Sequence, residues 1–376
     1  MTDSDDKYNA KIRAGLDAAF KRAEGKAERF DASSERIVVF SDHHKGCGDQ
    51  ADDFRRCEHA YAAALGYYLE AGYKLLVLGD SEELWEERPP GVLARYADVL
   101  ALEKEFAARG NGLVRFFGNH DDQWASAAQV RKHLRAALGD IAVRESLLLE
   151  VTSGAQSGRI FFVHGHQGSA DSDRWRGISR FVVRNIWRPL QRRFGYSATT
   201  PARSWELRAR HDRALYAWAV GRRPGLVLIG GHTHRPVFAR RVPDPPPTRP
   251  ISELETALAG ARERNDDEAA ASIRAELEYA RTSRRRPVQA FRVSPPCYFN
   301  TGCCSFPDGD ITGLELADGK IRLVRWAGNL REMCEPGQGV NASRRILETE
   351  ELANVFDAVA HPDSETEAVE HPVAAS

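Results

Sequence analysis

Residues 36–44 read RIVVFSDHH, an apolar run typical of a buried strand that ends in a carboxylate and two imidazoles. The same arrangement returns as KLLVLGDSEE (74–83), LVRFFGNHDD (113–122), IFFVHGH (160–166) and LVLIGGHTH (226–234). Helical patterns separate some of these runs, at residues 53–71 and 91–109. Strands that alternate with helices predict an α/β sheet.

Polar side chains gather where each predicted strand ends, the place where α/β sheets build their sites. A lone histidine there is more often structural, but five such elements in succession indicate a common centre. Carboxylate, imidazole and amide groups together favour Mn, Fe or Zn over a cysteine-rich structural zinc. The candidate ligands are Asp42, His44, Asp80, Asn119, His164, His232 and His234.

These motifs resemble those of the calcineurin-like metallophosphoesterases. That family has Asp-x-His, Gly-Asp-x-x-Asp/Glu, Gly-Asn-His-Asp/Glu, a His near a Gly, and Gly-His-x-His, and every element is here in order. The resemblance runs from about Arg36 to Trp326, apart from inserts. It implies two mixed β-sheets packed as a sandwich and flanked by helices, with metals at the strand ends.

The resemblance also implies a pair of divalent metals, Mn, Fe or Zn. Asp80 would bridge them, and a metal-bridging hydroxide would attack phosphorus in line. The first metal would be held by Asp42, His44 and His234, and the second by Asn119, His164 and His232.

His120, beside Asn119, is the candidate that protonates the leaving group. We expect Asp121 to orient His120 and raise its basicity. We expect Glu83 to support a ligand rather than bind metal. His43 and His166 are expected to have packing or supporting roles.

Composition excludes several protein classes. The chain has 376 residues, is 42% apolar and 28% charged, and so has the balance of a globular protein rather than a disordered or membrane chain. Lys and Arg (53) nearly equal Asp and Glu (54), which argues against a nucleic-acid partner. The acidic N-terminus lacks a signal-peptide pattern, and no apolar run is long enough to span a bilayer. Six cysteines without a Cys-x-x-Cys pair favour a reduced, cytoplasmic protein.

The pattern predicts three regions. Residues 1–35 hold an N-terminal amphipathic helix, expected over 6–30. Residues 36–330 form the phosphoesterase domain, interrupted by a helical cap at 169–224 and by a Pro-rich bridge with a charged helical insert at 243–288. Short strands and turns over 289–326 predict antiparallel strands that complete a second sheet. Residues 331–376 form an extension that is disordered from about 360.

The predicted cap is rich in arginine and aromatic residues, and two interpretations compete. In one it covers the core, with its arginines facing water. In the other it is a lid, in which Arg180 and Arg184 grip a second phosphate and apolar residues meet a lipid. The second interpretation is similar to the bacterial UDP-diacylglucosamine pyrophosphatases, although that branch has Arg where this chain has His120.

The leading hypothesis is a dinuclear metal-dependent hydrolase of phosphoester or pyrophosphate bonds. A nucleotide-sugar or lipid pyrophosphate is the first substrate to test, and the lid could then contact the inner face of a membrane peripherally. The alternatives are a phosphomonoesterase acting on protein or small molecules, and a non-catalytic scaffold that uses the same fold.

Overall fold

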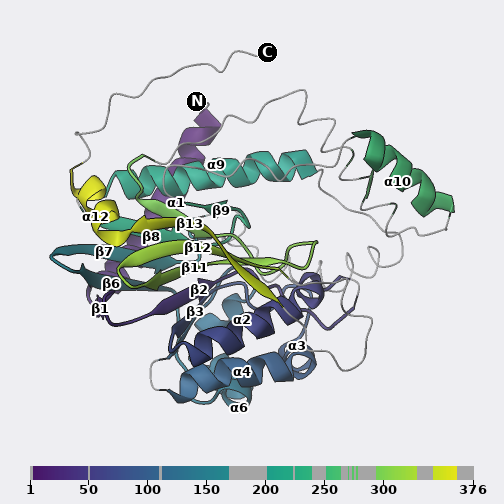
Figure 1. Ribbon diagram of the computed structural model, residues 1–376, viewed down its shortest axis with the longest axis horizontal. Coiled ribbons are helices and arrows are strands. Elements are labelled where there is room, and N and C mark those ends of the chain that lie inside the picture. The colour runs from purple at the N-terminus through teal and green to yellow at the C-terminus, as the bar shows by residue number, and fades with distance from the viewer. Residues whose placement is uncertain are drawn as a thin grey trace.

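The computed structural model describes residues 3–49, 51–109, 112–168, 201–222, 225–238, 251–263, 270, 273–274, 277, 294–327 and 342–361. Two sheets lie face to face, with helices on both outer sides (Figure 1). This architecture confirms the predicted α/β sandwich of two mixed sheets.

The first sheet has six strands in the order β1-β6-β7-β8-β10-β9. It mixes parallel pairs, such as β7 with β8, and antiparallel pairs, such as β6 with β7. Its strands are β1 (Glu28–Asp31), β6 (Ser146–Ser153), β7 (Gln156–Val163), β8 (Leu226–Gly230), β9 (Pro236–Val237) and β10 (Tyr298–Thr301).

The second sheet has seven strands in the order β13-β12-β11-β2-β3-β4-β5. Its parallel half, β2 to β5, carries three of the motif-bearing strands. Its strands are β2 (Ile37–Phe40), β3 (Lys74–Leu78), β4 (Leu113–Phe116), β5 (Val143–Arg144), β11 (Ile311–Ala317), β12 (Lys320–Ala327) and β13 (Ser343–Glu351).

Helices cover the outer face of each sheet, as the upper and lower layers of Figure 1 show. On the first sheet these are α1 (Asp3–Glu24), α9 (Pro201–Val220) and α12 (Leu352–Ala360). On the second they are α2 (Glu58–Glu70), α3 (Pro89–Arg95), α4 (Ala97–Ala108) and α6 (Arg135–Leu138). The remaining helical elements are η1 (Asp53–Arg56), η2 (Asp122–Ala125), α5 (Ala127–Gln129), η3 (Val130–Leu134) and α10 (Ile251–Glu263).

The strand β2 shows why this layering follows from the sequence. All four of its residues are buried, because both faces of the sheet are covered. Successive side chains alternate: Val39 packs in the core shared with the first sheet, whereas Val38 and Phe40 pack against the helices. A continuous apolar run is therefore the pattern that a doubly covered strand requires.

The structure differs from the predictions in four places: the end of the N-terminal helix, the sheet that β10 joins, the packing of α9 and the C-terminal segment. The N-terminal helix ends at Glu24 rather than near residue 30, and residues 28–31 form β1, which pairs parallel with β6. The strand β10 joins the first sheet as a parallel neighbour of β8, whereas β11 and β12 form the expected antiparallel pair in the second.

The other two differences enlarge the sandwich. The helix α9, predicted as part of the cap, packs in the main core through Leu215 and Trp218. The C-terminal segment adds β13 to the second sheet, and α12 buries Phe356 against the first. The sheet domain therefore continues to Ala360 instead of ending near residue 330. The rest of the cap (169–200) and residues 362–376 lie outside the described residues.

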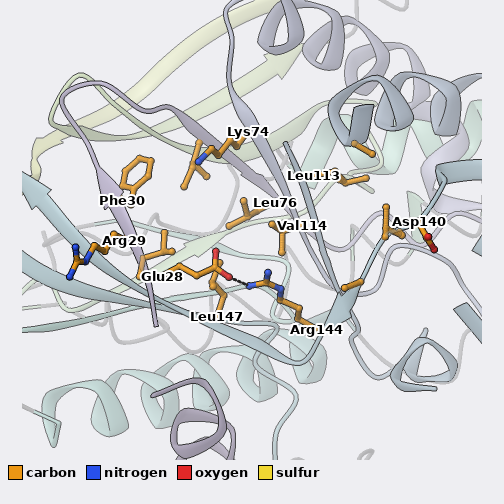
Figure 2. Close-up of a pocket in the computed structure, with 15 residues that line it drawn as sticks. Glu28, Arg29, Phe30, Lys74, Leu76, Leu113, Val114, Asp140, Arg144 and Leu147 are labelled. Carbon is orange, nitrogen blue, oxygen red and sulfur yellow. Dashed lines mark hydrogen bonds and ion pairs between the residues drawn. The ribbon is translucent and has the colours of Figure 1, made fainter. Parts of the chain in front are cut away.

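A cavity of about 450 Å³ lies between the sheets at the amino ends of β3 and β4 (Figure 2). Leu76, Val114 and Leu147 line its apolar wall, and the ion pair between Glu28 and Arg144 lies at its rim. The polar motifs follow the carboxyl ends of the same strands. The cavity is therefore separate from the candidate site.

Candidate metal centre

The first group of candidate ligands comes from the ends of β2 and β8. Nε2 of His234 lies 3.3 Å from Oδ1 of Asp42 and 3.1 Å from Nε2 of His44. The ligand atoms of these three residues all lie within 4.8 Å of one another. Three donors that converge in this way fit one divalent cation.

The second group comes from β3, β7 and β8. Asp80, His164 and His232 also place their ligand atoms within 4.8 Å of one another. Nδ1 of His164 donates to the carbonyl of Leu78 at 2.7 Å, which directs Nε2 toward Asp80 and makes Nε2 the ring nitrogen that would bind a metal.

Asp80 connects the two groups. Its Oδ2 lies 3.1 Å from Nε2 of His164 in the second group and 3.9 Å from Nε2 of His44 in the first. Its Oδ1 accepts the backbone N–H of His120 at 2.8 Å. Burial raises the pKa of Asp80, but His164 and His120 outweigh it and hold the pKa well below its ordinary value. The carboxylate is therefore charged, as a bridging ligand must be.

The backbone at this centre is unusual. Left-handed φ angles occur at Asp42 (55°), His44 (52°), Asp80 (49°), His232 (69°) and His234 (56°). A non-glycine residue in this region costs roughly 1–3 kcal/mol, and such residues cluster at functional sites. Among the described residues, the only other non-glycine with positive φ is Asp318. The turns that follow β2, β3 and β8 therefore store strain at the candidate ligands themselves.

Glycines let these turns approach one another. A Cβ placed on Gly118 would lie 2.0 Å from Oδ1 of Asp80 and 2.7 Å from its backbone nitrogen. A Cβ on Gly231 would lie 2.6 Å from Oδ2 of Asp42. Only glycine allows the motif loops to pack this closely around the two carboxylates.

The donor set fits metal ions. Oδ1 of Asn119 is buried and lacks a hydrogen-bond partner within the described part of the chain, and Nε2 of the buried His164 faces Oδ2 of Asp80 at 3.1 Å. Burial lowers the pKa of His232 well below its usual value and that of His234 to about 4. Neutral imidazoles and ionised carboxylates are the forms that bind metal.

His120 has a different partner from the one predicted. Its Nδ1 lies 2.7 Å from Oε2 of Glu83, and the same oxygen lies 3.0 Å from Nδ1 of His44. The Asp121 carboxylate turns away and accepts the backbone N–H groups of Gly118 and Ser81, at 2.6 and 2.8 Å. The prediction that Asp121 orients His120 was wrong: Glu83 does so, and Asp121 braces the loop.

Charge in this cluster follows from those contacts. Burial disfavours protonated His120, but Glu83 and Asp80 outweigh it and raise the pKa of His120 to about 10. Burial also raises the pKa of Glu83, yet His120 and His44 lower it to about 2. Burial and then Asp80 raise the pKa of Asp121 to about 7. Glu83 and His120 therefore form an ion pair at neutral pH, with a proton available on His120.

Trp85 is a neighbour of His120 that the motifs did not single out. Its ring stacks on the His120 ring, with centroids 4.4 Å apart and an interplanar angle of 17°. Its Nε1 donates to the carbonyl of Asn119 at 2.5 Å. The only sequence signal was its position two residues after Glu83.

Three further histidines lie close to candidate ligands in the sequence or in space. His43 is fully buried against Phe54 and Tyr61, which agrees with the expected packing role. The His166 ring lies 5.4 Å from that of His164. His211, on α9, was not predicted: its Nε2 donates to the carbonyl of Gly165 at 2.7 Å.

Arg180 and Arg184 lie outside the described residues. Within the described residues, no helix combines the length and hydropathy that crossing a bilayer requires.

Comparison with known proteins identifies one family. The sequence model for calcineurin-like phosphoesterases matches residues 35–236, more than half of the chain. No curated protein gives a significant match.

Two solved structures show distant similarity. A single mutant of Vps29 from Entamoeba histolytica is 10% identical, with 83% of this chain and 99% of that one covered and a TM-score of 0.25. GAP50, the anchor in the inner membrane complex of Plasmodium, is 12% identical, with coverages of 86% and 94% and a TM-score of 0.30. Similarity this low carries no functional information.

Proposed function

The chain belongs to the calcineurin-like phosphoesterase family, and we propose on that premise that it is a dinuclear metal-dependent hydrolase of phosphoester or phosphoanhydride bonds. The observation that carries this proposal is the position of Asp80 between two converging ligand groups. In this assignment Asp42, His44 and His234 hold one metal, Asn119, His164 and His232 hold the other, and Asp80 contacts both.

The chain's own residues account for the rest of the chemistry. When bound, two divalent metals would polarise the phosphoryl group and make hydroxide available near neutral pH. His120 holds a proton on its imidazolium and would give it to the leaving oxygen. Glu83 and Trp85 fix the direction of that imidazole.

The first experiment measures hydrolysis of a chromogenic phosphodiester with and without Mn, using Asp80→Ala as the control. We expect Mn-dependent turnover in the wild type and its loss in the variant. Metal analysis of the same samples tests the bridging role, because an Asp80→Ala protein that retained both metals would refute it. A folded wild type that purified without stoichiometric metal and stayed inactive with Mn would support the scaffold alternative.

For the substrate, we propose a nucleotide-sugar or lipid-linked pyrophosphate, and the arginines of residues 169–200 are its sequence support. Removing Arg180 and Arg184 together should raise KM for such a pyrophosphate and leave KM for a small synthetic ester unchanged. Equal losses on both substrates, together with impaired folding, would support the covering-helix interpretation. Preferential hydrolysis of monoesters would favour the phosphomonoesterase alternative.

A further inference from the structure

Thr233 lies between two candidate ligands that belong to different groups. His232 is grouped with Asp80 and His164, whereas His234 is grouped with Asp42 and His44. Both histidines have left-handed backbones, with φ of 69° and 56°. Such conformations persist only where the surroundings hold them in place. The restraint on this segment is therefore part of how the centre is built.

The backbone N–H of His232 donates to the Asp42 carboxylate, and a second restraint on this segment comes from α9. Oγ1 of Thr233 donates to Oδ1 of Asp212 at 2.8 Å, and the hydroxyl of Tyr298 donates to the same oxygen at 2.9 Å. Asp212 is 1% exposed, as is Thr233. A carboxylate can only accept, so the direction of both bonds is fixed. Arg235 lies near the other oxygen, with Nη1 3.5 Å from Oδ2.

Asn300 closes the network from β10. Its Nδ2 donates to the carbonyl of Gly231 at 2.7 Å and lies 3.2 Å from Oγ1 of Thr233. Its Oδ1 accepts the backbone N–H of Gly302 at 3.0 Å. The segment from Gly231 to Thr233 is thus fixed on two sides by groups that water does not reach. The hydrogen bonds made by Oδ1 of Asp212 and Nδ2 of Asn300 are buried, where a low dielectric strengthens them.

We propose that Asp212 is a positioning residue for the metal centre: through Thr233 it holds His232 and His234 in the orientations that aim them at two different ligand groups. This role rests on the proposed dinuclear function. Asp212 does not touch the ligand atoms, and it acts on both histidines at once because Thr233 is bonded to each. Groups that orient ligands typically change metal affinity about 10–100-fold when removed.

The test is a double-mutant cycle between Asp212 and Thr233, read out as Mn binding by titration calorimetry. Asp212→Leu removes the carboxylate that accepts the hydrogen bonds from Thr233 and Tyr298. Thr233→Val removes the hydroxyl that donates to Asp212 with little change in shape. We expect each to weaken Mn affinity about tenfold, at the low end of that range, because the contact to the histidines is indirect. The double variant should bind no more weakly than either single variant, because both break one interaction.

Conservative variants separate positioning from general stabilisation. Asp212→Asn retains an acceptor oxygen and Thr233→Ser retains the donor, so both should keep near wild-type affinity. Trp218→Phe is the control on the same helix: it removes the 2.7 Å bond from Nε1 to Asp17 and part of a ring that packs in the core. It should lower the melting temperature without changing Mn affinity. If Asp212→Leu does not fold, the Thr233 variants give the same comparison.

The failures are distinguishable. Wild-type protein that binds none of Mn, Fe and Zn would overturn the metal centre and this role with it. Mn binding by the wild type that is unchanged in Thr233→Val or Asp212→Leu would overturn the role alone. Additive losses in the double variant would also overturn it, because they would show that the two residues act independently.

Discussion

Glu83 and His120 form an ion pair across the motif loops, with Oε2 of Glu83 2.7 Å from Nδ1 of His120. This contact sets the protonation of the imidazole, whereas Asp121, the next residue along the chain, binds backbone N–H groups instead. The two acids therefore have separable effects, which mutation can distinguish.

Glu83→Gln should move the alkaline limb of the pH profile of kcat/KM to lower pH. The pKa of His120 is raised to about 10, so its proton is present below that pH and is lost as pH rises through it. Without the negative charge of Glu83 the pKa of His120 is lower, so His120 loses its proton at a lower pH. Asp121→Asn is the control: it should leave the limb in place and lower stability by about 1–3 kcal/mol, because one backbone N–H loses its acceptor. The opposite pattern would restore Asp121 as the orienting residue.

Trp85→Ala should lower kcat and Trp85→Phe should retain most of it. Stacked aromatic pairs contribute about 0.5–1.5 kcal/mol, which corresponds to a roughly two- to tenfold change in rate. Phenylalanine keeps a ring over His120 but loses the bond to the Asn119 carbonyl. Steady-state kinetics on the chromogenic ester would measure kcat for both variants. Equal losses in both variants would show that the hydrogen bond, rather than the stack, matters.

Gly118→Ala should displace Asp80 and weaken metal binding, because its Cβ would lie 2.0 Å from the Asp80 carboxylate. Gly66→Ala is a matched control within α2, where an added Cβ meets nothing within 4 Å. Helix propensity predicts that this control gains about 0.5–1 kcal/mol. Gly118→Ala should therefore melt at a lower temperature and retain less metal than wild type, whereas Gly66→Ala should melt at a higher temperature with unchanged metal content. Full metal content in Gly118→Ala would contradict the close packing described.

The stability of the fold should fall between pH 6.5 and pH 4 partly because of His211. Burial lowers the pKa of His211 to about 4, whereas the unfolded chain has a pKa near 6.5. The unfolded state therefore binds the proton first as pH falls, and the contribution present above pH 6.5 is lost, by at most about 3 kcal/mol. His211→Gln, which keeps a donor for Gly165, should flatten this dependence in chemical denaturation. An unchanged slope would rule out His211 as its source.

Phe356→Ala should destabilise the protein by about 3–5 kcal/mol, the usual range for a buried phenylalanine. Phe356 on α12 is 1% exposed and packs where a Cβ on Gly158 of β7 would lie 2.2 Å from its ring. Mn affinity should not change, since α12 packs on β7, β8 and β13. A small effect on unfolding would mean that the C-terminal segment is dispensable for the sandwich.

Apolar runs made the central strands predictable, because a strand covered on both faces has no polar positions to obscure it. The edge strands lacked that signal. In β1 only Phe30 is buried, and no residue of β13 is, so the sequence predicts the end of the N-terminal helix at β1 and a C-terminal extension at β13. The helix α9 was misread for a related reason, because its buried face includes His211 and Asp212, which resemble exposed positions until their partners are known.

The candidate ligands were predictable because each follows a strand end, and parallel strands bring those ends together. The partner of His120 was not predictable. Glu83 and Asp121 follow neighbouring strands, and either could reach the imidazole. The choice depends on side-chain direction: Asp121 folds back onto the amide of Gly118, three residues earlier, and leaves Glu83 to contact the ring.

The left-handed backbone at five candidate ligands has a consequence for protein engineering. Glycine would adopt these φ angles without steric strain, so selection for thermal stability alone, without metal, should favour glycine at His234, whose side chain is 23% exposed. The resulting protein would melt at a higher temperature and lose one ligand of the first group. Directed evolution of this chain toward heat resistance should therefore include a screen for metal binding from the first round.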